Sequence, residues 1–201
     1  MTDQPARRPV LFVHGIWDEG DIFDAMVAGL RARGFTHLAA IDLVPNDGSV
    51  PLAESAKQLD AAARALLARS GADKLDLVGF SMGSLVARWW LVKQGGRDLT
   101  GRFISISGPQ SGTLTAHFNR KPGVAEMRPG SDFLKALEAD EQGFGKVEVL
   151  SMWTPLDLMI VPARSGVLKD SEVQKFWVAL HPLMASDGKV IEAVASALAR
   201  R

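Results

Sequence analysis

Short apolar runs alternate along this chain with longer segments in which apolar residues recur at helical spacing. The runs are rich in Val, Leu, Ile and Phe, which is typical of strands that are buried on both faces of a sheet. Six such strands are predicted, at residues 10–13, 38–41, 74–79, 102–106, 147–152 and 172–180.

The segments between these runs predict helices with one apolar face. In the first, 21–33, Ile22, Met26 and Leu30 are spaced so that their side chains align on one side of a helix. Gly95-Gly96 ends the helix that begins at Met82, because glycine readily adopts the left-handed conformation that closes helices. The remaining helices are predicted at 52–68, 82–94, 131–139 and 189–199.

Strands and helices that alternate in this way predict an α/β protein with a mostly parallel sheet and helices on both faces. We expect one domain over residues 1–201, with an irregular insertion at 108–146 after the fourth strand. In such sheets ligands bind at the carboxyl ends of the strands, so chemistry is expected in the loops that follow them.

Composition narrows the class of protein further. The chain has 201 residues, of which 47% are hydrophobic and 23% charged, as in globular proteins, which excludes a disordered or collagen-like chain. Lys and Arg together equal Asp and Glu at 23 each, so net charge gives no bulk drive toward nucleic acid or an anionic membrane. Cysteine is absent, which excludes disulfides, a thiolate metal site and a cysteine nucleophile.

The hydropathy of the chain also bears on its location. No apolar run approaches the 18 or so residues of a membrane span. The apolar stretch 10–13 is too short for the core of a signal peptide. A cytoplasmic protein without a membrane span is therefore expected.

The strongest chemical signal is Gly79-Phe-Ser81-Met-Gly83, between a predicted strand and a predicted helix. This G-x-S-x-G pattern is typical of a nucleophile elbow, in which a sharp turn exposes the serine hydroxyl at the sheet edge. The two glycines let strand and helix pack closely around the serine. The alternative is a glycine-rich turn whose serine only caps the helix.

With its neighbours, this motif resembles the α/β-hydrolases, and among them the small lipases and esterases. The resemblance extends from about residue 10 to the C-terminus and implies a minimal α/β-hydrolase fold with about six strands and no large lid domain. It departs from the family pattern at Phe80, Ser84 and Ser111, where His, Gly and His are usual. The motifs that carry it are His14-Gly15, 76–88, 107–113, 127–134, 154–162 and 181–184.

Elimination among the four histidines favours His181 as the general base. His14 precedes the serine, against the family order of serine, acid and histidine, and is expected to shape the oxyanion loop. His37 opens a strand at the opposite edge and is interpreted as a surface residue. His117, in the irregular insertion, is the second candidate for the base, whereas His181 follows the last predicted strand.

Asp157 is the expected acid of the triad. It follows the fifth predicted strand among apolar neighbours, where a carboxylate needs a hydrogen-bonded partner to stay charged. His181 would be that partner, held in the tautomer that leaves its other nitrogen free to accept the serine proton. Asp170, in a polar turn, is the competing candidate.

The remaining site residues are expected around the scissile carbonyl. The backbone amides of Ile16 and Met82 would form the oxyanion hole, and Met159 and Ile160 would line the acyl-binding groove. No metal or cofactor is required. The predicted helix 131–139 has a single apolar stripe, enough to dock on the protein, so an open, shallow groove for short- to medium-chain esters is expected.

These residues together predict a serine hydrolase that cleaves small-molecule carboxylic esters through an acyl-enzyme on Ser81. Two alternatives remain open. The same triad could serve a thioesterase or acyltransferase, or the fold could be a catalytically silent binding protein.

Overall fold

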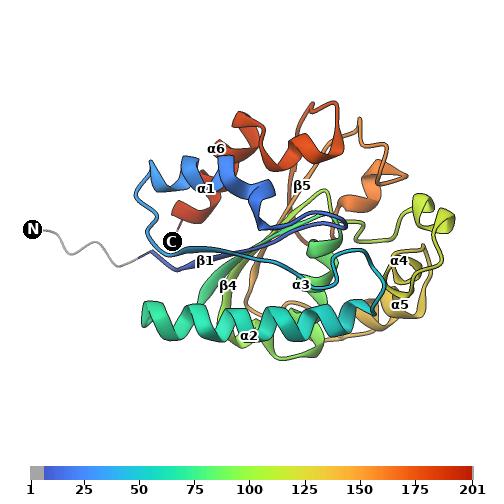
Figure 1. Ribbon diagram of the computed structural model, residues 1–201, viewed down its shortest axis with the longest axis horizontal. Helices are drawn as coiled ribbons and strands as arrows, with labels where there is room; N and C mark the ends of the chain where they lie inside the picture. The colour runs from blue at the N-terminus through green and yellow to red at the C-terminus, as the bar shows by residue number, and fades with distance from the viewer. Residues whose placement is uncertain (1–6, 201) are drawn as a thin grey trace, which may run out of the picture.

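The computed structural model describes residues 7–200 and contains one six-stranded sheet (Figure 1). The strand order is β2-β1-β3-β4-β5-β6 and every neighbouring pair is parallel, which confirms the predicted sheet. The strands are β1 (Val10–Val13), β2 (Leu38–Ile41), β3 (Leu75–Phe80), β4 (Thr100–Ile106), β5 (Glu148–Trp153) and β6 (Glu172–Lys175).

Helices cover both faces of the sheet (Figure 1). On one face α1 (Asp24–Arg31) and α6 (Gly188–Ala199) pack against side chains such as Phe12 and Val78. On the other face α2 (Leu52–Ser70), α3 (Met82–Lys93) and α5 (Asp132–Glu138) pack against side chains such as Leu11 and Leu77. Neighbouring residues of one strand thus enter opposite cores, which explains why the strands are apolar throughout.

The last strand is shorter than predicted. β6 ends at Lys175 instead of residue 180. Its partner β5 ends at Trp153, so beyond the bond from the Phe176 amide to the Trp153 carbonyl the chain has no strand to pair with. Residues 176–180 therefore form a loop, and their apolar side chains do not signal a strand.

The segment 108–146 contains more helix than the sequence predicted. Besides α5, it forms a 3₁₀ turn at Leu114–Phe118 and the short helix α4 (Pro122–Glu126). Ser131 caps α5 as predicted, since its hydroxyl accepts a hydrogen bond from the Leu134 amide. The apolar stripe of α5 is buried, and Phe133 stacks on Trp89 of α3 with ring centroids 4.6 Å apart.

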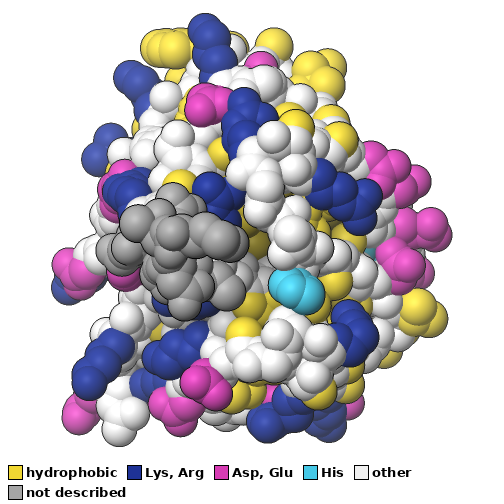
Figure 2. All heavy atoms as spheres, turned by 90° about the vertical axis from the view of Figure 1, so that its left-hand side faces the viewer, with side chains coloured by type: hydrophobic (Ala, Val, Ile, Leu, Met, Phe, Trp, Pro, Cys, Tyr) yellow, Lys and Arg dark blue, Asp and Glu magenta, His cyan; other side chains and the backbone are white. Residues whose placement is uncertain are grey.

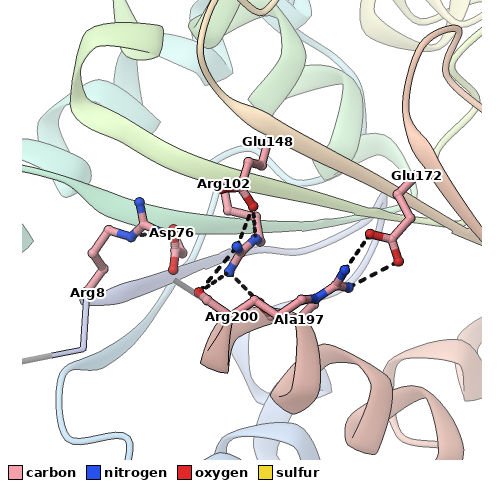
Figure 3. Close-up of polar contacts among 7 residues, drawn as sticks. All are labelled: Arg8, Asp76, Arg102, Glu148, Glu172, Ala197 and Arg200. Carbon is pink, nitrogen blue, oxygen red and sulfur yellow. Dashed lines mark hydrogen bonds and ion pairs between the residues drawn. The ribbon is translucent and has the colours of Figure 1, made fainter. Parts of the chain in front are cut away.

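Ion pairs hold the opposite, amino edge of the sheet, a region that we call the amino-edge network (Arg8, Asp76, Arg102, Glu148, Glu172 and Arg200; Figure 3). Arg102 of β4 is buried; its guanidinium contacts Glu148 of β5 and donates to the carbonyl of Ala197 in α6. Arg200 pairs with Glu172 through contacts of 2.6 and 3.1 Å. Figure 2 shows Lys and Arg side chains spread over this face with Asp and Glu among them.

Candidate active site

Ser81 occupies the sharp turn between β3 and α3. Its backbone has φ 52° and ψ −126°, outside the regions that a non-glycine residue ordinarily adopts. A Cβ on Gly83 would lie 2.3 Å from the carbonyl oxygens of Val13 and His14, and one on Gly79 2.7 Å from Ser84 Cα. The two glycines of the motif are therefore needed for the close approach of strand and helix.

Ser84, one of the departures from the family pattern, is accommodated by its own hydrogen bond. The Ser84 hydroxyl donates to the Gly79 carbonyl at 2.7 Å. A Cβ on Gly108 would lie 2.4 Å from the Ser84 Cβ, so the loop after β4 leaves room for this side chain by carrying glycine. The substitution therefore leaves the turn intact.

Asp157 and His181 lie together, as the sequence predicted for a hydrogen-bonded pair. His181 Nδ1 is 2.7 Å from Asp157 Oδ2, and both side chains are buried. The other carboxylate oxygen, Oδ1, accepts hydrogen bonds from the amides of Met159 and Ile160, each at 2.9 Å. These contacts fix the carboxylate and favour the tautomer in which Nδ1 of His181 carries the proton.

The imidazole lies beside the elbow with its second nitrogen free. The His181 ring packs against Phe80, the residue before Ser81, with ring centroids 4.9 Å apart. Nε2 is enclosed and has no hydrogen-bond partner in residues 7–200, and no hydrogen bond joins it to the Ser81 hydroxyl. A buried nitrogen that can accept a proton thus has no competing partner, on a ring that packs against the residue before the serine.

The segment after β1 passes directly over the serine. A Cβ on Gly15 would lie 2.9 Å from Ser81 Cβ. His14 contacts this segment through both ring nitrogens. Its Nε2 accepts a hydrogen bond from the Leu43 amide at 2.9 Å, and its Nδ1 lies 2.8 Å from the Gly15 carbonyl oxygen. The backbone amides of Ile16 and Met82 donate no hydrogen bond to any group of the described chain. The neighbouring Trp17 amide, in contrast, donates to the Asn46 carbonyl.

The other candidates lie apart from this arrangement. His37 and His117 are exposed, and neither makes a side-chain hydrogen bond within residues 7–200. Asp170 is exposed in a turn with φ 61°. None of the three therefore joins the buried group around Ser81.

An apolar cavity of about 210 Å³ opens beside Ser81. Met159 and Ile160 both line it, together with Ile16, Val124 and Met127. Trp17 and Phe118, which are largely exposed, also border it. The cavity can take an uncharged chain of a few carbon atoms next to the serine hydroxyl.

Asp18 is a site residue that sequence reasoning missed. Its carboxylate lies over the Gly15 backbone, where a Cβ on that glycine would be 2.7 Å from Oδ2. Burial raises the pKa of Asp18 above its ordinary value, an effect that His14 and His181 oppose. Its position four residues after His14, in the loop that follows the first strand, could have indicated that it lies near the site.

The described residues include no group of three or more His, Asp or Glu side chains arranged to hold a metal ion. None of the helices between residues 7 and 200 combines the length and the apolar character needed to cross a bilayer.

Comparison with known proteins places this site in context. A model of the alpha/beta hydrolase family matches residues 10–199. No curated protein matches the chain. Solved structures do: the mature lipase BlEst2 of Bacillus licheniformis has a TM-score of 0.81 at 18% identity and covers 97% of this chain and 93% of its own.

Two further structures share the fold. Lipase B of Aspergillus fumigatus has a TM-score of 0.79 at 16% identity, over 96% of this chain and 53% of its own. The monoacylglycerol lipase of Paleococcus ferrophilus has a TM-score of 0.69 at 16% identity, over 96% of this chain and 95% of its own. At these identities the likeness is one of fold, and it confirms the predicted architecture.

Proposed function

Since the chain belongs to the α/β hydrolase family, we propose that it is a serine hydrolase that cleaves carboxylic esters. The observation that carries the proposal is the buried His181–Asp157 pair. Its Nε2 has no partner, and its ring packs against Phe80, which directly precedes Ser81 at the strained turn. A histidine fixed in this way is suited to accept a proton from a serine hydroxyl.

In the first half of the reaction Ser81 Oγ attacks the ester carbonyl while its proton passes to His181 Nε2. The resulting oxyanion would be held by the amides of Ile16 and Met82, whose N–H groups have no other acceptor in the described chain. The bond to the alcohol oxygen then breaks, and that oxygen takes the proton from His181. An acyl-enzyme on Ser81 remains.

In the second half water repeats these steps. His181 Nε2 takes a proton from the water, the hydroxide attacks the acyl carbonyl, and Ser81 leaves with the proton from His181. Throughout, Asp157 orients the imidazole and stabilises its positive charge, and two backbone amides in turn hold the carboxylate in place.

The cavity beside Ser81 favours an uncharged acyl group. Its walls are mainly apolar side chains, among them the buried Ile160, and no Asp, Glu, Lys or Arg lines it. A charged acyl chain would lose its hydration there without gaining a charged partner. We therefore assign Met159 and Ile160 to binding of a short or medium acyl chain.

A p-nitrophenyl ester series from acetate to palmitate tests this function. We expect turnover, covalent labelling of the protein by a fluorophosphonate, and loss of both in Ser81→Ala. Folded protein that releases no p-nitrophenol from any ester and takes up no label would overturn the proposal. Parallel assays with an acyl thioester and with an added alcohol acceptor separate ester hydrolysis from thioester cleavage and acyl transfer.

A further inference from the structure

Large apolar side chains are exposed mainly at the edge of the sheet that carries the candidate site. Of the eleven exposed among the described residues, nine lie in the loops that follow β1, β4, β5 and β6. Phe118 is 92% exposed and Leu158 79%. We call these nine residues the apolar rim: Trp17, Leu114, Phe118, Leu156, Leu158, Met159, Trp177, Leu180 and Leu183.

Backbone and side-chain hydrogen bonds join three of these loops into one surface. The Leu114 amide donates to the Val161 carbonyl at 2.8 Å, which links the loops after β4 and β5. The Thr154 hydroxyl donates to the Val178 carbonyl at 2.8 Å, which links the loops after β5 and β6. Trp17, Phe118 and Met159 belong both to the rim and to the border of the cavity at Ser81. The rim is thus continuous with the acyl-binding cavity.

Charged residues are sparse in these three loops. The charged residues directly adjacent to them in sequence are basic, and the acidic Asp187 lies two residues beyond the third loop. Residues 107–119, 154–163 and 176–185 contain a single Asp, Glu, Lys or Arg, the buried Asp157. Arg120, Arg164 and Lys175 follow or precede these loops and form no ion pair within residues 7–200. Acidic residues adjoin rim residues in two places: the buried Asp157 lies between Leu156 and Leu158, and Asp18 and Glu19 follow Trp17 in the short loop after β1.

We propose that the apolar rim docks onto a lipid surface that carries anionic headgroups, a role that rests on the proposed ester hydrolase. Exposed aromatic and aliphatic side chains with basic residues at their margin match the boundary between acyl chains and anionic headgroups. A second copy of the chain bound to the rim would cover the mouth of the cavity and block access of substrate to Ser81. A lipid surface bound at the same place would instead supply an apolar ester to Ser81.

The sequence predicted that the helix at 131–139 docks on the protein, and it predicted no surface that faces lipid. The apolar stripe of α5 is buried against the protein, as predicted, so no apolar face of this helix is exposed to lipid. The apolar residues that do face outward lie in loops instead.

Vesicle flotation tests the docking independently of catalysis. The probe is the full chain carrying Ser81→Ala, mixed with vesicles of phosphatidylcholine alone or with phosphatidylglycerol. We expect binding to the anionic vesicles that falls about tenfold when Leu158→Ser and Trp177→Ser are added, because two exposed apolar anchors are lost. Val173→Ser, which changes an exposed residue of β6 outside the rim, should bind as the parent does.

Other outcomes overturn the docking. They are binding to neither vesicle, equal binding to both, or a dimer in solution that Leu158→Ser and Trp177→Ser dissociate. The same two substitutions in the active protein should leave hydrolysis of soluble p-nitrophenyl acetate unchanged, since neither residue lines the cavity. Vesicle binding without ester turnover would refute only the proposed function, and turnover without vesicle binding only the docking.

Discussion

At the amino edge of the sheet charged side chains are paired with one another, whereas at the carboxyl edge apolar side chains stand exposed around a few buried polar groups. The amino-edge network joins β3, β4, β5, β6 and α6 through contacts among side chains and helix carbonyls (Figure 3). At the other edge, Nε2 of His181 has no partner and Ser81 has a strained backbone.

This contrast separates residues that stabilise the fold from residues available for chemistry. Unpaired buried groups and strained backbone cost stability and persist where a function uses them. Substitutions at the carboxyl edge should therefore alter activity and leave stability nearly unchanged, and substitutions at the amino edge should do the reverse.

The largest effect is expected from Ser81→Ala, His181→Ala and their combination. Each should lower kcat by a factor on the order of 10⁶, and the double variant by no more, because triad members act as a unit. The thermal unfolding midpoint of Ser81→Ala should stay close to that of the parent. Initial rates on a p-nitrophenyl ester and calorimetry measure the two quantities.

His117→Ala is the matched control for the histidine. It removes an exposed imidazole and should retain the full rate. If His117→Ala lost activity while His181→Ala kept it, the assignment of the base would be wrong.

The next effect is expected from Arg102→Ala at the amino edge. This substitution removes one of the two donors to the Ala197 carbonyl, which keeps only the Arg200 amide. It also removes a buried side chain that packs between β5 and α6 and pairs with Glu148. We expect a loss of about 2–3 kcal/mol in the free energy of unfolding, with kcat unchanged. Urea denaturation gives the stability. A change in kcat with no change in stability would contradict the division between the edges.

Much of this division could be predicted from sequence. The elbow at Ser81 and the pairing of Asp157 with His181 follow from short motifs of consecutive residues. The strands that precede these motifs can be recognised as short apolar runs. The amino-edge network could not be predicted, because its partners are brought together only by strand order and by the docking of α6.

Two residues of the apolar rim lie where the sequence predicted a strand that does not form. The run Phe176-Trp-Val-Ala-Leu180 has the hydropathy of a buried strand, but β5 ends too early to pair with it, so Trp177 and Leu180 are exposed. Apolar runs predict burial only where a neighbouring element is available to cover them.

An effect of similar size but opposite sign is expected from Asp76→Asn. Burial raises the pKa of Asp76 from 3.8 to about 6, although Arg8 and Arg102 oppose the shift. A carboxyl whose pKa is higher in the folded state than in the unfolded chain destabilises the fold once it is ionised. The cost is absent below pH 3.8 and complete above pH 6.

Asn carries no such charge, so the free energy of unfolding of the variant relative to the parent should rise by up to about 3 kcal/mol between pH 4 and pH 8. Urea denaturation at both pH values provides the test. A relative stability that stays constant across this range would show that Arg8 and Arg102 fully compensate the buried charge.

The smallest effect is expected from Glu172→Gln, which weakens the outermost contact of the same network. Arg200 and Glu172 pair with good geometry, but both side chains are about half exposed, so solvent screens their attraction. Such pairs contribute about 0.2–1 kcal/mol, and the loss should shrink further in 1 M salt. Asp132→Asn, which affects a pair on the exposed surface of α5, is the control and should change stability even less. If the loss of stability in Glu172→Gln persisted at high salt, solvent would not screen this pair. The pair would then stabilise the fold together with the buried contacts of Arg102, although its side chains are half exposed.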